Sequence, residues 1–141
     1  MPAKICISLI SLAITCSFAQ AQPIENSPNL TKVANQLRYG AIGAAGLDGA
    51  STDWVLRSGK AYEANPIAPT STSGIVGISL LKAGAVELAY RSDLTLTQKA
   101  QVGNTTRAIW AGAAANNILI GLGATGAAPI VGGLAIGYML W

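Results

Sequence analysis

Serine, threonine or lysine activated by aspartate, glutamate or lysine would have to do any nucleophilic chemistry in this chain, because the sequence contains no histidine and its two cysteines, Cys6 and Cys16, lie in a predicted signal peptide. A serine nucleophile would then need a lysine or a carboxylate as its base. Ser79 lies three residues before Lys82 and shares a helix face with it, but pairs at this spacing are common by chance. Residues 121–126 match G-x-G-x-x-G without the preceding strand and following acidic residue that a nucleotide-binding loop needs. We therefore expect no enzyme, no catalytic residue and no cofactor or metal site.

Ionisable side chains inside apolar segments are a second chemical feature. Asp48 lies nine residues after Tyr39, where a first apolar run begins, and Lys82 lies nine residues after Ser73, where a second begins. An ionisable group inside a bilayer costs several kcal/mol unless it has a partner. If the two runs form antiparallel neighbouring helices, Asp48 and Lys82 lie at the same depth. We therefore predict a buried Asp48–Lys82 pair.

Three further polar residues could join this pair. Thr52 follows Asp48 by four residues and shares its helix face. Asn116 and Asn117 lie in a third predicted helix and can add amide hydrogen bonds. One interpretation is a site for an ion, a proton or a small solute within a helical bundle. The other is a structural lock that fixes which helices pack together, and it is favoured because nothing else in the sequence indicates a transport path.

The connector after the first apolar run contains Glu63-Ala64-Asn65-Pro66. Asn65 can cap a helix that begins at Pro66, with Glu63 near the positive end of the helix dipole. From spacing alone, the segment indicates a helix start and nothing more specific.

Taken in order, these short motifs resemble an uncharacterised family of small bacterial integral-membrane proteins. In that family an aspartate and a threonine (D-x-x-x-T) lie on the first span, E-x-N-P follows it, a lysine lies on the second span and an asparagine pattern closes the third. The resemblance covers roughly residues 39–120, and the chain differs in its signal peptide, its abundant glycine and an added apolar segment at its C-terminal end. The family has no established activity, so the resemblance implies a fold and a polar cluster but no reaction. The candidate intramembrane polar cluster comprises Asp48, Thr52, Glu63, Asn65, Lys82 and Asn117.

Residues 1–21 have the three parts of a secretory signal peptide: one charge at Lys4, an apolar run, and an Ala19-Gln20-Ala21 cleavage site. An uncleaved anchor and a lipoprotein acylated at Cys16 are the alternatives. Cleavage removes both cysteines and leaves eight basic and six acidic residues. That balance is too small to indicate nucleic-acid binding.

The remaining chain predicts an all-α fold: a bundle of three to four apolar helices in a membrane. Residues 22–38 form a polar lead into the first helix, and residues 39–141 form the membrane helical domain. We expect helices over about 29–58 and 73–90, a third that starts at the Thr95–Gln98 capping box, and a fourth over about 128–141. Residues 108–141 carry no formal charge, and their glycines and Pro129 predict a turn between the last two helices.

Small residues in the first apolar run predict close helix packing. Gly40, Gly43, Gly46 and Gly49 recur every three residues, which would cost a soluble helix stability but lets membrane helices approach closely. Tyrosine and tryptophan lie at the segment ends, as they do at membrane interfaces. A flexible glycine-rich loop is the alternative for this run, and a soluble bundle with a Gly/Ala core is the alternative for the whole chain.

We therefore expect a small protein of the bacterial inner membrane, structural or accessory in role, whose partners are the lipid bilayer and possible further copies joined through small-residue helix faces. The competing hypothesis is a secreted or membrane-inserted Gly/Ala-rich helical subunit that self-assembles, pilin-like or pore-forming. The orientation is contradictory. Cleavage places residue 22 outside the cytoplasm, and most basic residues then face outward against the positive-inside rule.

Overall fold

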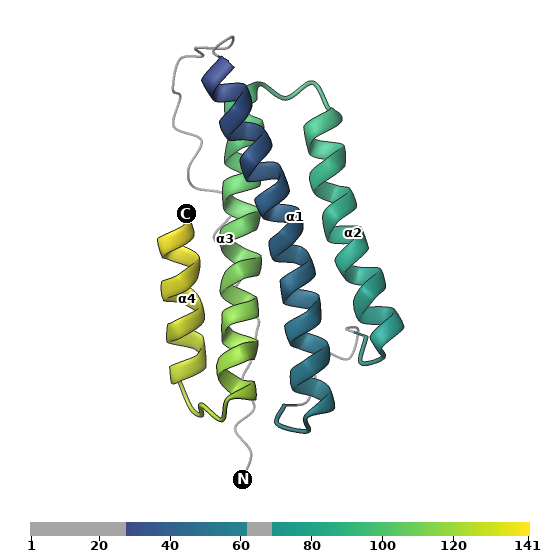
Figure 1. Cartoon of the computed structure of the whole chain (residues 1–141), viewed down its shortest axis with the longest axis vertical. Helices are drawn as coiled ribbons and strands as arrows, with labels where there is room; N and C mark the ends of the chain where they lie inside the picture. Colours follow the sequence, from purple (N-terminus) through teal and green to yellow (C-terminus); the bar gives the residue numbers. More distant parts are fainter. Residues whose placement is uncertain (1–27, 62–68) are drawn as a thin grey trace.

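The computed structural model describes residues 28–61 and 69–141, and these residues contain helices and no strand. The helices are α1 (Pro28–Arg57), α2 (Thr72–Arg91), α3 (Leu96–Gly121) and α4 (Ala128–Leu140) (Figure 1). Each helix end that the sequence predicts lies within one residue of its observed position. The predicted all-α class is confirmed for the described residues, because they form helices and no strand. The predicted signal peptide, Glu63 and Asn65 lie outside the described residues.

Local signals set these helix ends. The Ser71 hydroxyl accepts a hydrogen bond from the Gly74 amide at 3.2 Å and caps α2. The predicted capping box is present, because Thr95 and Gln98 each accept a hydrogen bond from the other's backbone. Gly123 and Gly126, at φ 96° and 65°, take left-handed conformations that turn the chain from α3 into α4.

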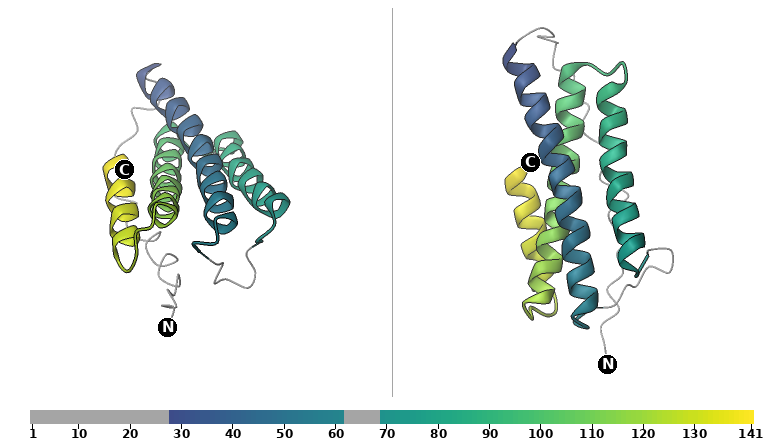
Figure 2. Two further views of the ribbon diagram at one scale, coloured as in Figure 1. Left: turned by 60° about the horizontal axis from the view of Figure 1, so that its bottom comes forward. Right: turned by 45° about the vertical axis from the view of Figure 1, so that its right-hand side comes forward.

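The four helices lie side by side in the order α4, α3, α1, α2 (Figures 1 and 2). The most extensive packing joins α1 to α3, which run in the same direction. The oppositely directed α2 lies against α1 and barely touches α3, while α4 packs on α3. The helices α2 and α4 do not touch each other, so each keeps a broad outer face.

Small side chains fill the space between the helices. Val86 is the largest fully buried side chain among the described residues. The buried apolar residues are otherwise mostly alanines: Ala34, Ala41, Ala44, Ala45, Ala108, Ala114 and Ala115, together with Val55 and Ile75. Such a core buries little apolar area per residue, so burial of large side chains is not what holds these helices together.

Large apolar side chains lie on the outside of the bundle instead. On α2, Leu80, Leu81 and Leu88 are each about 70% exposed, and on α4 Leu134 and Met139 are exposed to a similar or greater degree. Among the described helices, only α2 is both long and apolar enough to cross a membrane by length and hydropathy, and few of its residues are buried.

Glycines let the backbones of α3 and α4 come into contact. A Cβ atom at Gly112 would lie 2.7 Å from the carbonyl oxygen of Gly133, and one at Gly133 would lie 2.6 Å from that of Gly112. A Cβ atom at Gly137 would lie 2.9 Å from the Ala108 carbonyl oxygen. Real side chains do not approach this closely, so the two helices can pack this way only with glycine at these positions.

We expect Gly112→Ala to separate α3 from α4 and to destabilise the protein by about 1–3 kcal/mol, the usual cost of overpacking. Gly43→Ala is the matched control, because a Cβ atom at Gly43 meets nothing within 4 Å. Its higher helix propensity should add up to ~1 kcal/mol of stability. Denaturant unfolding in detergent micelles, followed by circular dichroism, measures both changes. Equal effects of the two substitutions would contradict backbone contact between α3 and α4.

Candidate polar site between the first three helices

An ion pair between α1 and α2 forms the centre of the candidate site. The Lys82 ammonium group donates a hydrogen bond to Oδ2 of Asp48. The Asp48 side chain is 10% exposed and that of Lys82 is 28% exposed. The carboxylate is thus enclosed by the bundle, whereas the lysine reaches it from the outer edge. The structure brings together the two residues that the sequence places at equal depth.

Asn117 links this pair to α3. Its Nδ2 donates to Oγ1 of Thr52 at 2.9 Å and makes longer contacts of 3.4 Å with Oδ1 of Asp48 and Oγ of Ser51. The Thr52 and Ser51 hydroxyls themselves donate to the Asp48 carbonyl oxygen, at 2.7 and 3.0 Å. Three helices therefore meet around one carboxylate through a connected set of hydrogen bonds.

Helix spacing and a close contact place these groups together. Residues 48, 51 and 52 share one face of α1, because neighbours three or four positions apart lie above one another on a helix. One turn of α2 lies directly against Gly49, where a Cβ atom would lie 2.0 Å from the Ser79 hydroxyl. This glycine brings α2 close enough for Lys82 to reach Asp48.

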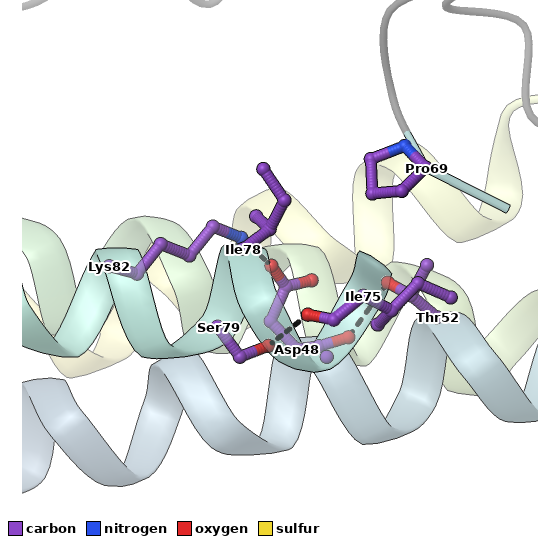
Figure 3. A pocket seen from close by; sticks show the side chains of 8 residues that line it. Asp48, Thr52, Pro69, Ile75, Ile78, Ser79 and Lys82 are labelled. Carbon is purple, nitrogen blue, oxygen red and sulfur yellow. Dashed lines mark hydrogen bonds and ion pairs between the residues drawn. The ribbon is translucent and has the colours of Figure 1, made fainter. Parts of the chain in front are cut away.

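A cleft of about 200 Å³ opens beside the ion pair between α1 and α2. Figure 3 shows Lys82 toward one end of it and Pro69 and Thr52 toward the other, with Asp48 between them. Ile75 and Ile78 supply apolar parts of its lining. The cleft therefore leads from the polar pair toward the start of α2.

The Trp110 ring of α3 offers the lysine a second favourable contact. Its centroid lies 5.8 Å from the Lys82 nitrogen, within the range of a cation–π interaction. The ammonium group thus lies between a carboxylate on α1 and an aromatic face on α3. Sequence reasoning missed Trp110, because the side of α3 that faces Lys82 depends on how the helices pack.

Two residues that the sequence associates with chemistry or with this cluster have other roles. Asn116 lies beside α4, where its Cβ is 3.0 Å from the Cβ position of Gly133. Its buried Oδ1 has no hydrogen-bond partner among the described residues. The expectation that both asparagines join the cluster is thus met by Asn117 alone. The Ser79 hydroxyl donates to the Ile75 carbonyl at 3.0 Å, so it forms no nucleophile pair with Lys82.

Two further polar contacts tie α2 to α1 on either side of the candidate site. Toward the N-terminal end of α1, Arg38 binds Glu87 through both of its carboxylate oxygens, with one N···O distance of 2.7 Å. Toward the other end, the Thr72 hydroxyl donates to Oδ1 of Asp53 at 2.7 Å. Sequence reasoning gave Glu87 and Asp53 no partners, although the antiparallel register set by Asp48 and Lys82 points to both contacts.

Comparisons with protein-family models, curated proteins and solved structures find no match to this chain. The described residues contain no group of three or more histidine, cysteine, aspartate or glutamate side chains that could hold a metal ion. The site's chemistry therefore has to be inferred from its own geometry: one carboxylate, one ammonium, two hydroxyls and one amide around a small cleft.

The ion pair and the helix packing should be energetically coupled. We expect Asp48→Ala and Lys82→Ala each to destabilise the protein, since each leaves a charge without its partner. The double variant should be less destabilised than the sum of the two, with a coupling of about 1–3 kcal/mol. Unfolding midpoints of all four proteins in the same detergent measure this coupling.

Lys32→Ala provides the control for charge removal, because Lys32 is exposed on the first turns of α1. Combined with Asp48→Ala, it should give an additive effect. Additive effects for Asp48→Ala and Lys82→Ala would contradict the pairing.

Proposed function

We propose that this chain is a small integral-membrane protein of the bacterial inner membrane with a structural or accessory role. In this proposal α1, α2 and α3 cross the bilayer, the shorter α4 enters it partway beside α3, and an N-terminal signal peptide directs export. The helices of 30, 20 and 26 residues are long enough, because about 20 residues span the hydrocarbon core.

The distribution of apolar side chains carries the proposal. Proteins folded in water bury most of their large apolar side chains, such as leucine and isoleucine, and place polar side chains outside. This bundle has the reverse arrangement: alanine and glycine lie between the helices, and leucines line the outer face of α2. Membrane helices associate in this way, because lipid chains are as apolar as leucine while small residues allow close packing.

The polar side chains of α2 support the same proposal. Thr72, Ser79, Lys82 and Glu87 all lie toward α1, and three of them bond to its side chains. A helix that turns its polar face inward and its leucines outward suits an apolar surrounding. One polar side that faces a partner helix is the arrangement expected for ionisable groups within a bilayer.

Membrane insertion is tested by alkaline carbonate extraction of membranes from cells that express the full chain. We expect the protein to stay with the membrane pellet. Leu81→Asp should sharply reduce the amount of integrated protein, since a charge at the centre of a spanning helix costs about 2.5–3.5 kcal/mol on insertion scales. Thr70→Asp is the control, because exposed Thr70 lies before the first residue of α2.

Release of the unsubstituted protein by carbonate would contradict the proposal. An unchanged or increased amount of Leu81→Asp in the membrane pellet would also contradict it, because a leucine that faces water can be replaced by a charged residue at little cost. Recovery in extracellular or filament fractions would favour a self-assembling secreted subunit instead.

Reporter fusions test the orientation. The basic residues Lys32, Arg38, Arg91 and Lys99 lie on helix segments at one end of the bundle (Figure 1). The signal peptide directs this end outward, whereas the positive-inside rule directs it to the cytoplasm. We expect the signal peptide to dominate, so alkaline phosphatase fused after Ser92, in the loop between α2 and α3, should be active and a fusion at Gly59 inactive. The opposite pattern would contradict cleavage and export.

A further inference from the structure

We propose that Asp48, Ser51, Thr52 and Asn117 form a binding site for a small monovalent metal cation, and that Lys82 is its built-in competitor. The ammonium group of Lys82 occupies Asp48 when the cation is absent and moves toward Trp110 when the cation enters. This inference deepens the proposed function, because it assigns a ligand class to the polar cluster of that bundle.

The oxygen atoms around Asp48 supply the ligands. Among the described residues, Oδ1 of Asp48 receives only a 3.4 Å contact, from Nδ2 of Asn117. The Thr52 and Ser51 hydroxyls direct their hydrogens to the Asp48 carbonyl, so their oxygens remain available as acceptors. A rotation of about 180° around the last side-chain bond of Asn117 exchanges its two amide atoms, so that Oδ1 takes the position of Nδ2. One carboxylate, two hydroxyl oxygens and one amide oxygen then converge on the same space.

The charge of the site selects a monovalent ion. Among the described residues, Asp48 is the only acidic side chain in the hydrogen-bonded cluster, and Lys82 is the only basic one. Divalent cations such as Ca²⁺ are held by six to eight oxygen ligands, usually several of them carboxylates. A single carboxylate balances one positive charge, as it does for the ammonium group already bound there. An alkali cation is therefore the matching ligand.

Lys82 can leave Asp48 without leaving the site. Its side chain is nearly three times as exposed as that of Asp48, so it bounds the pair on the open side. Trp110 lies 5.8 Å from its nitrogen and offers a second position for the charge.

The cleft provides the path to the carboxylate. Asp48, Thr52 and Lys82 all line it, and its volume of about 200 Å³ exceeds that of an alkali ion with several waters. It also reaches Pro69, just before α2 begins (Figure 3). A cation can thus reach Asp48 along α2 without a separation of the helices.

Fluorescence of Trp110 in the purified full chain tests the site. Trp54→Phe and Trp141→Phe leave Trp110 as the single tryptophan, since the sequence contains three. Sodium, potassium and lithium chlorides are titrated in turn against N-methyl-D-glucamine chloride at constant ionic strength. We expect a saturable change in Trp110 emission with at least one alkali ion, and none with N-methyl-D-glucamine, which is too large for the site.

Variants separate a competitor from a structural lock. In the same single-tryptophan protein, Lys82→Gln should bind the cation roughly tenfold more tightly, because no ammonium group then competes with the cation for Asp48. Its affinity is measured from the cation-dependent rise in the unfolding midpoint, since this variant has no ammonium group to move toward Trp110. Thr52→Val should weaken binding while it leaves the ion pair intact, and Asp48→Asn should abolish it. Exposed Lys32→Gln is the charge-matched control and should leave the affinity unchanged.

Two results would overturn the inference. One is the absence of any saturable response to an alkali cation in both the parent and the Lys82→Gln proteins, while circular dichroism shows intact helices. The Asp48–Lys82 pair would then serve only to hold α1 and α2 together. The other is a response that persists in Asp48→Asn. Both are measured in purified protein, so they are distinct from a failure of membrane insertion, which carbonate extraction detects.

Discussion

Close contact between helix backbones is the constraint on which the rest of the structure depends. Gly112 and Gly133 bring α3 and α4 together, and Gly103 lies against Leu37 where α3 meets α1. Such contacts leave no room for large side chains in the interior, so the leucines and isoleucines must lie outside. In water these exposed side chains would contribute no burial to folding and would favour association, whereas in lipid their exposure carries no cost. The close packing of the helices and the proposed lipid environment therefore follow from the same small residues between the helices.

The attachment of α2 follows from the same constraint. Because α2 buries few apolar side chains, polar contacts with α1 hold it in place: Asp48–Lys82 at the centre, with Arg38–Glu87 and Asp53–Thr72 on either side. Contacts of this kind are stronger where the surroundings are apolar. A helix held by a few polar contacts can also leave a cleft beside them, as it does at Asp48. The feature that positions α2 thus also keeps the candidate site accessible.

Local signals made much of the fold predictable. The Thr95–Gln98 capping box, the glycines of the last turn and the proline at the start of α4 act over a few residues, and the helix ends fall where they indicate. The Asp48–Lys82 contact was predictable because both residues are rare charges at equal depth. The rotation of each helix about its axis was not, because it is set by contacts between distant glycines. For this reason sequence reasoning could not separate Asn117, which faces Asp48, from Asn116, which faces α4.

The environment of the outer face of α2 decides between a bundle in lipid and a bundle in water. With Cys6 and Cys16 replaced by serine, single cysteines at Leu80, Leu81 and Leu88 can carry nitroxide spin labels, and a fourth at Thr70 provides the reference for an aqueous position. In reconstituted vesicles, we expect molecular oxygen, which concentrates in lipid, to relax the labels at the three leucine positions more effectively than a water-soluble nickel chelate does. The Thr70 label should show the reverse preference. Preferential access of the nickel chelate to all four positions would contradict a membrane-spanning α2 whose leucines face lipid.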